Sequence, residues 1–160
     1  MQPSFVLPRD YPGQNCSIAR TLEVLGDRWT LLIVRDSLFS GRRFDDYLQR
    51  LGLARNVLSE RLARLVDDRI LERVPYQASP RRYEYRITAK GRELLPVLVA
   101  MIEWGDRYYA PGGPPRVVVH EGCGGEVEQS LRCEACAEEV FAEDVSTLPG
   151  PGWRTTAAAG

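Results

Sequence analysis

The sequence predicts a mainly helical α+β protein, a winged helix-turn-helix followed by a small C-terminal zinc-ribbon-like β appendage. Apolar residues recur at helical spacing as far as about residue 68, and two short alternating segments follow at 70–74 and 83–87. Beyond the glycine- and proline-rich residues 110–115, three of the four cysteines and the only histidine lie close together. These changes of pattern divide the chain into a helical part, a hairpin and a cysteine-rich end.

Four helices are expected ahead of the hairpin, each bounded by a glycine or by a capping side chain such as Asn15 or Asp27. They cover about residues 15–25, 27–38, 44–51 and 54–68. In the fourth, Leu58, Leu62 and Leu65 repeat on one face and are expected in the core. Two short helices joined by a tight turn, followed by two strands, form the winged variant of the helix-turn-helix.

After the hairpin, Thr88 is expected to cap one long helix that extends to about Tyr109, with Pro96 causing at most a slight kink. Its broad apolar face favours packing against a second copy of the chain together with residues 16–25. Packing within one chain is the alternative.

The expected organisation has five parts. These are an N-terminal arm at 1–14, a DNA-binding and dimerisation domain at 15–110, a linker at 111–115, a zinc-ribbon-like segment at 116–146 and a disordered tail at 147–160. No run of 18 apolar residues and no secretion signal is found, so we expect a cytoplasmic protein without a membrane partner.

The distribution of charge favours a polyanionic partner. The whole chain has a formal net charge of −1, yet residues 42–92 carry 13 Lys and Arg against 7 Asp and Glu. Residues 111–160 carry 3 against 8. A basic stretch of this kind indicates contact with double-stranded DNA through one face, although a solvated arginine-rich helix surface would have the same composition.

The helix at 54–68 has the composition of a recognition helix. Arg55, Asn56 and Ser59 can face outward near its start, where Arg can pair with guanine and Asn with adenine. A contact of Arg55 with phosphate alone stays open. The other residues expected to contact DNA, through the backbone or from the hairpin, are Arg42, Arg43, Arg61, Arg64, Ser79, Arg81 and Arg82.

From about Cys16 to Arg107 the chain resembles the HxlR-type winged helix regulators of bacteria. The motifs that carry the resemblance, in order, are Cys16, GDRW at 26–29, RRF at 42–44, LSERL at 58–62, YRITAKG at 85–91 and WGD at 104–106. The resemblance implies a homodimer, formed through the first helix and the long helix, that represses or activates nearby genes; we expect a repressor on an inverted-repeat operator. Ala54 departs from the Ser or Thr of many members, which weakens helix capping or one phosphate contact by about 1 kcal/mol.

No catalytic constellation is found, so an enzyme is not expected. The acidic pairs 45–46 and 67–68 point about 100° apart on their helices and form no carboxylate dyad. Trp29 and Trp104 could line a small-molecule pocket, or belong to the core or the dimer interface. The alternative function is a ligand- or redox-sensing module in which DNA binding is secondary.

Cys16 is a candidate redox sensor. Several HxlR-type regulators use a cysteine at the matching position to sense electrophiles or oxidants, and a helix N-terminus favours the thiolate form. The alternative is a small buried residue beside the dimer interface.

The C-terminal cluster has the spacing H-x₂-C-x₉-C-x₂-C, formed by His120, Cys123, Cys133 and Cys136. Two short pairs separated by a loop predict one structural zinc per chain, held by three thiolates and one imidazole. A metal-free hairpin with reduced thiols and a Cys133–Cys136 redox pair are the alternatives.

Overall fold

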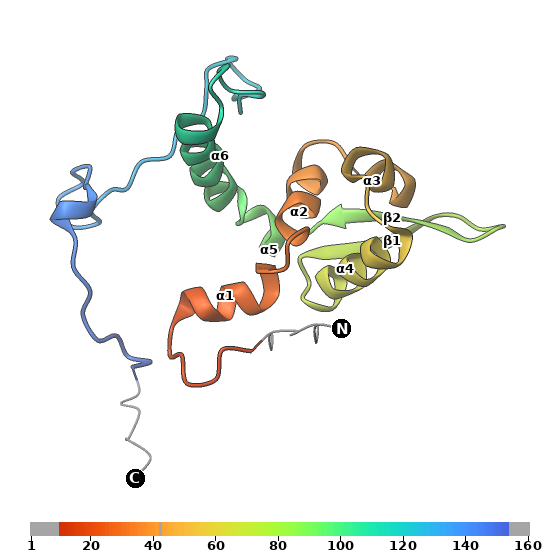
Figure 1. Cartoon of the computed structure of the whole chain (residues 1–160), viewed down its shortest axis with the longest axis horizontal. Coiled ribbons are helices and arrows are strands. Elements are labelled where there is room, and N and C mark those ends of the chain that lie inside the picture. The colour runs from red at the N-terminus through yellow and green to blue at the C-terminus, as the bar shows by residue number, and fades with distance from the viewer. Residues whose placement is uncertain (1–9, 42, 154–160) are drawn as a thin grey trace, which may run out of the picture. The chain divides into compact units, whose positions relative to one another are not determined.

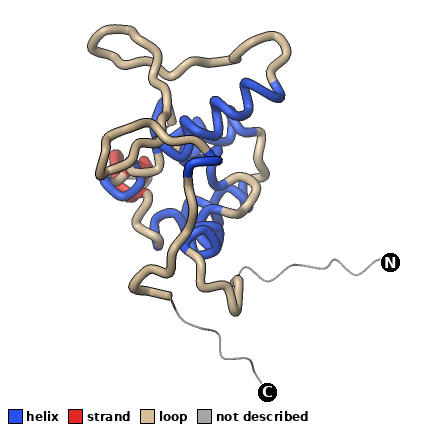
Figure 2. The backbone as a smooth tube through the Cα atoms, turned by 90° about the vertical axis from the view of Figure 1, so that its left-hand side faces the viewer, coloured by secondary structure: helices blue, strands red, loops and turns tan. Residues whose placement is uncertain are grey.

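The computed structural model describes residues 10–41 and 43–153. Helices and loops make up most of this part of the chain, and its strands lie in one hairpin (Figure 2). The chain divides into two compact units: residues up to Thr88 together with those from Pro149 onward form unit 1, and Ala89–Leu148 form unit 2. The division at Thr88 falls inside the segment 15–110 that was expected to be one domain.

Unit 1 contains four helices and the hairpin in the predicted order (Figure 1). Their bounds are α1 Ser17–Leu25, α2 Thr30–Phe39, α3 Phe44–Leu51, α4 Arg55–Asp67, β1 Leu71–Gln77 and β2 Arg82–Ile87. The mainly helical fold with a small two-stranded sheet is therefore confirmed.

Two helix starts differ from the prediction. Cys16, not Asn15, is the N-cap residue of α1. Asp27 does not begin α2, because its carbonyl accepts the N–H of Thr30 at 3.0 Å in a separate turn and the helix starts only at Thr30. The Asp27 carboxylate instead forms ion pairs with α4, described below.

The strands of the hairpin pair antiparallel from Leu71 opposite Ile87 to Gln77 opposite Arg82. The ladder is irregular between Pro75 and Gln77, which fits the missing N–H of proline. An isolated bridge between Arg43 and Glu84 joins the residue before α3 to β2.

The core of unit 1 lies between the helices and one side of the hairpin. α2, α3 and α4 contact one another, α4 contacts β1, and α2 and α3 contact β2. The fully buried side chains are Ile33, Val34, Tyr47, Leu58, Leu62, Leu65 and Leu71. The three leucines predicted to face inward from α4 are thus in the core.

Tyr47 is the polar centre of this core. Its hydroxyl donates to the Gly41 carbonyl at 3.1 Å and lies 2.8 Å from Ser37 Oγ on α2. Its ring meets that of Tyr85 on β2 edge to face, with 6.4 Å between the centroids. Burial raises the pKa of Tyr47 from 10.0 to about 12. The Tyr47 side chain of α3 therefore contacts α2, the turn at Gly41 that follows α2, and the hairpin.

Gly41 allows a close approach to Tyr47 at this junction. A Cβ at this position would lie 3.0 Å from Cε1 of Tyr47, tighter than ordinary van der Waals contact. Glycine is favoured at position 52 for a different reason. Gly52 ends α3 with φ +64°, in the left-handed region that favours glycine.

Unit 2 contains α5 Ala89–Arg92, α6 Leu95–Tyr109 and the 3₁₀ helix η1 Ala142–Asp144. The predicted single long helix is wrong, because it is interrupted after Arg92. Pro96 lies in the first turn of α6; it has no N–H to donate, and its ring would collide with the carbonyl of Arg92 in a continuous helix.

The predicted strand at 116–120 is also wrong, since only an isolated bridge between Val119 and Glu126 is found there. A second isolated bridge joins Arg132 and Glu139. Further along the chain, residues 150–153 at the described start of the tail form a turn. The Trp153 N–H donates to the Gly150 carbonyl at 2.9 Å. The disorder expected for residues 147–160 stays a prediction.

We predict that Tyr47→Phe lowers the free energy of unfolding by about 1–3 kcal/mol, because the variant leaves the buried Gly41 carbonyl without its donor. Urea unfolding at neutral pH and fixed protein concentration measures the change. Tyr76→Phe, at a partly exposed hairpin position, is the matched control and is expected to change stability by less than about 0.5 kcal/mol.

The raised pKa of Tyr47 also predicts a pH dependence. Because the folded-state pKa lies above the unfolded value, the stabilisation is complete below pH 10.0 and is lost as pH rises to about 12. The wild-type protein should lose more stability across this interval than Tyr47→Phe. Equal losses in both proteins would contradict the assignment to Tyr47.

Candidate nucleic-acid interface

The start of α4 presents polar side chains to solvent while its opposite face is buried. Arg55, Asn56 and Ser59 are exposed, whereas Leu58 lies in the core. The Arg55 side chain is 70% exposed; its Nη2 lies 3.1 Å from Asp45 Oδ1 and its guanidinium lies over the Phe44 ring. Exposed ion pairs contribute at most about 1 kcal/mol, so Arg55 can exchange Asp45 for another partner.

Arg61 and Arg64, further along α4, are in a different environment. The Arg61 side chain is only 15% exposed, and its Nη1 lies 2.9 Å from Asp27 Oδ2. Arg64 reaches the same oxygen at 3.1 Å and Glu60 at 2.8 Å. These ion pairs hold α4 against the turn between α1 and α2. The predicted phosphate contacts of the two arginines remain predictions, and they would compete with these pairs.

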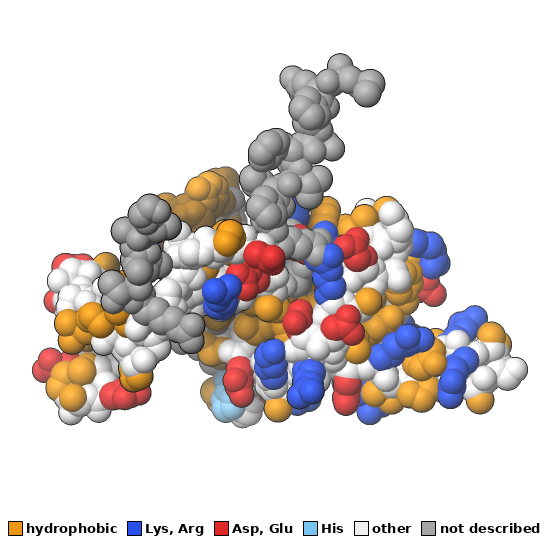
Figure 3. All heavy atoms as spheres, turned by 90° about the horizontal axis from the view of Figure 1, so that it is seen from below, with side chains coloured by type: hydrophobic (Ala, Val, Ile, Leu, Met, Phe, Trp, Pro, Cys, Tyr) orange, Lys and Arg blue, Asp and Glu red, His pale blue; other side chains and the backbone are white. Residues whose placement is uncertain are grey.

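The hairpin carries a second group of cations. Ser79, Arg81 and Arg82 are exposed at its tip, as predicted. The Arg73 guanidinium lies 3.6 Å from the centroid of the Tyr83 ring, and that of Arg81 lies 5.9 Å from it. Figure 3 shows Lys and Arg side chains along the end of the molecule from which β1 and β2 project.

Arg43 links the helices to the hairpin. Its backbone N–H donates to Asp46 Oδ2 at 3.0 Å, its backbone bridges to Glu84, and its guanidinium lies 4.6 Å from the centroid of the Tyr76 ring. The start of α3 therefore lies beside the hairpin and, through the Asp45–Arg55 pair, beside the start of α4. Arg42 lies outside the described residues.

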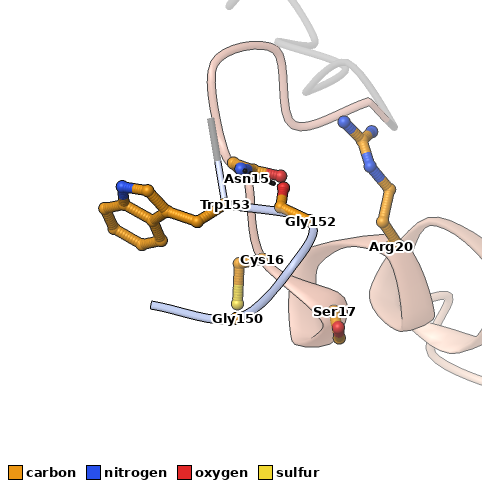
Figure 4. Close-up of a pocket in the computed structure, with 7 residues that line it drawn as sticks. All are labelled: Asn15, Cys16, Ser17, Arg20, Gly150, Gly152 and Trp153. Atoms are coloured by element: carbon orange, nitrogen blue, oxygen red, sulfur yellow. Dashed lines mark hydrogen bonds between the residues drawn. The ribbon is translucent and has the colours of Figure 1, made fainter. Parts of the chain in front are cut away.

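A pocket at the N-terminus of α1 was not predicted. Its volume is about 300 Å³, and Figure 4 shows its lining, which consists of Asn15, Cys16, Ser17, Arg20, Gly150, Gly152 and Trp153. Asn15 Nδ2 donates to the Gly152 carbonyl at 3.1 Å. Cys16 is a free, exposed thiol in this chain, so the candidate sensor is accessible from the pocket. The glycine- and proline-rich tail gave no periodic signal from which this contact could be predicted.

The helices α1, in unit 1, and α6, in unit 2, each expose two or more large apolar side chains. On α1 these are Ile18 and Leu22; on α6 they are Val97, Met101, Trp104, Tyr108 and Tyr109. The Trp104 ring contacts those of Tyr108 and Tyr109, with 5.5 Å and 5.2 Å between centroids. Neither Trp29 nor Trp104 lines the pocket at Cys16.

The four candidate zinc ligands are arranged as two pairs. His120 Nδ1 lies 3.3 Å from Cys123 Sγ in one turn. In another turn, the backbone N–H groups of Cys136 and Ala135 donate to the Cys133 thiol and, with a side-chain contact from Cys136, lower its pKa. Among the described residues, no three or more His, Cys, Asp or Glu side chains are gathered where they could share an ion.

In the part of the chain that the structure describes, no helix is long and apolar enough to cross a membrane.

Known proteins are similar to large parts of this chain. The family model for the HxlR-like helix-turn-helix matches residues 24–112. The HTH-type transcriptional regulator Rv3095 of Mycobacterium tuberculosis, itself uncharacterized, is 43% identical over 143 residues, covering 89% of this chain and 90% of its own.

Two solved structures are also similar. PA1607, a candidate transcription factor, has a TM-score of 0.76 and 38% identity, and the match covers 84% of this chain and 95% of that one. The redox regulator HypR in its oxidized form has a TM-score of 0.54 and 29% identity, covering 57% and 96%.

The matched region contains all of the α4 and hairpin residues described above and spans more than half of the chain. The curated relatives are transcriptional regulators rather than enzymes. The chain therefore belongs to the HxlR-like helix-turn-helix family of transcriptional regulators.

Proposed function

We propose that this regulator binds an inverted-repeat operator as a homodimer and represses the adjacent gene. The observation that carries the proposal is the exposed first turn of α4, with Arg55 and Asn56 outward and Leu58 in the core. A helix of this kind enters the major groove with its N-terminal residues against base edges. Arg55 would then read guanine and Asn56 adenine.

The hairpin supports the same proposal. Arg81 and Arg82 lie at its exposed tip, where they can contact the backbone or the minor groove beside the bases read by α4. Arg43 lies at the start of α3, between the two elements. Repression follows if the operator overlaps the promoter, because the bound dimer then blocks RNA polymerase.

The apolar side chains exposed on α1 and α6 support the dimer. Trp104 is 57% exposed and Ile18 is 70% exposed in the single chain. Patches of large apolar residues on a soluble chain mark interaction surfaces. A second copy would bury them, and a twofold axis would set two copies of α4 about one helical turn of DNA apart.

Redox control through Cys16 is a second candidate function. HypR, with which the chain shares its fold, is a redox regulator. In this chain the Cys16 thiol is exposed at the N-cap of α1, in the pocket with Trp153. Modification of a thiol on an element proposed to form the dimer would alter the spacing of the two copies of α4.

We predict that Arg55→Ala weakens binding to the operator by about 1–3 kcal/mol and relaxes the preference for one base, because a bidentate contact is lost. Arg82→Ala should weaken binding to operator and random DNA alike. It should also reduce, by about 1, the slope of the logarithm of the binding constant against the logarithm of the salt concentration. Fluorescence anisotropy with both duplexes at several salt concentrations measures these effects.

Two variants control this comparison. Arg116→Ala removes an exposed positive charge from unit 2 and should leave affinity nearly unchanged. Asp45→Asn releases Arg55 from its ion pair and should preserve or tighten operator binding. If Arg55→Ala weakens binding to random DNA as much as binding to the operator, the proposed base contact of Arg55 is wrong.

We predict that Ile18→Glu or Trp104→Glu shifts the protein toward monomer, because each would place a charge in an apolar interface. Sedimentation equilibrium should show a dimer dissociation constant raised at least about 100-fold, or 2.7 kcal/mol. Leu148→Glu, at another exposed apolar position, is the control. A dimer unaffected by both substitutions would refute the proposed interface.

We predict that diamide or a quinone weakens operator binding by the wild-type protein and that Cys16→Ser removes this response, because the accessible thiol is the reacting group. Gel shifts before and after treatment measure it, and Ser17→Ala, at the exposed position next to Cys16, is the matched control. An undiminished response in Cys16→Ser would rule out sensing by Cys16.

A further inference from the structure

The two cysteine-containing turns of unit 2 have the same backbone hydrogen bonds, displaced by thirteen residues. In the first, the His120 N–H donates to the Gly125 carbonyl at 2.8 Å and the Gly124 N–H to the His120 carbonyl at 2.8 Å. In the second, the Cys133 N–H donates to the Glu138 carbonyl at 2.9 Å and the Ala137 N–H to the Cys133 carbonyl at 2.9 Å. Each turn is closed by an isolated bridge at the equivalent position.

The residue after the second candidate ligand has a left-handed backbone in both turns. Gly124 has φ +73° and Ala137 has φ +61°. Glycine adopts this conformation freely, but alanine does so at a cost of about 1–2 kcal/mol. The second turn therefore keeps its shape in spite of the residue at position 137, which indicates that the shape itself is needed.

The shape brings two ligands together in each turn. His120 Nδ1 lies 3.3 Å from Cys123 Sγ. In the second turn the Cys133 and Cys136 thiols contact each other, and backbone N–H groups of Cys136 and Ala135 point at the Cys133 sulfur. Each turn thus brings two potential metal ligands close to each other.

The surrounding segment has no core of its own. No residue from 111 to 148 is buried. Its exposed apolar side chains are Val117, Val119, Val127, Leu131, Phe141, Val145 and Leu148. A segment this small with no apolar core needs a disulfide, a metal or a partner to hold one conformation. All four cysteines of the chain are free, so no disulfide does this.

We propose that His120, Cys123, Cys133 and Cys136 bind one structural zinc ion, with the two turns closing on it as two halves of a tetrahedral site. Nine residues separate Cys123 from Cys133, and at about 3.3 Å each they can span up to about 30 Å, ample to fold back. Three thiols lose their protons on binding, and the imidazole enters neutral. Sulfur ligands select zinc over magnesium or calcium, and four protein ligands leave no open position.

The test begins with zinc content of the full-length protein, purified without chelator and measured by plasma mass spectrometry. We expect about one zinc per chain. After exchange for cobalt(II), the absorption spectrum should show tetrahedral coordination with a charge-transfer intensity for three thiolates. Circular dichroism of the helices verifies that each variant keeps unit 1 folded.

Substitutions identify the ligands. Replacing any one of the four ligands should lower zinc affinity more than about 100-fold. Loss of a residue that only hydrogen-bonds to a ligand costs about 10–100-fold. The four variants are His120→Ala, Cys123→Ser, Cys133→Ser and Cys136→Ser. Cys16→Ser is the matched cysteine control and should retain full zinc. Ala137→Gly, which relieves the left-handed position, should bind zinc at least as tightly as the wild type, and Ala137→Val more weakly.

Four results would overturn the proposal. They are well below one zinc per chain in the wild-type protein, a cobalt spectrum with two thiolates, loss of zinc in Cys16→Ser, and half a zinc per chain with an ion shared between two copies.

Discussion

The packing of Tyr47 is the interaction on which the rest of unit 1 depends. Its ring is fully buried on α3, and its hydroxyl joins Ser37 on α2 to the Gly41 turn. Its edge contact with Tyr85 extends the junction to the hairpin. A buried hydroxyl with satisfied partners fixes one arrangement of the elements around it, because any other would leave polar groups unpaired. The arrangement of α2, α3 and the hairpin is therefore set by a specific contact as well as by apolar burial.

The arginines of α4 are of two kinds, which differ in exposure and in their ion-pair partners. Arg55, at the first turn, is exposed and held by a solvated pair with Asp45 and by contact with the Phe44 ring. Arg61, half-way along, is mostly covered and paired with Asp27. The first can be offered to DNA at little cost, whereas the second holds the helix in place. A recognition helix needs both kinds of arginine. Its base-contacting side chains can be specific only when the helix that carries them is held in a fixed position.

The helices, the hairpin and the inward face of α4 could be predicted because each has a local signal, the spacing of Leu58, Leu62 and Leu65 above all. The predicted long helix failed at Pro96, where a missing N–H outweighed a continuous apolar pattern. The roles of Arg61 and the pocket at Cys16 depend on contacts between residues far apart in sequence, with Asp27 and with residues 150–153, and no periodicity encodes these. Spacing alone predicted the two pairs of candidate ligands, but not the matching hydrogen bonds of their turns.

The account's central claim is that the first turn of α4 and the hairpin tip form the DNA-reading surface of a rigid unit 1. Hydrogen exchange of the full chain, with and without a duplex that the protein has selected from random DNA, tests it most directly. We expect slower exchange on binding at residues 54–59 and 77–82, with no change at residues 133–144. Protection confined to unit 2, or none in α4, would contradict the account.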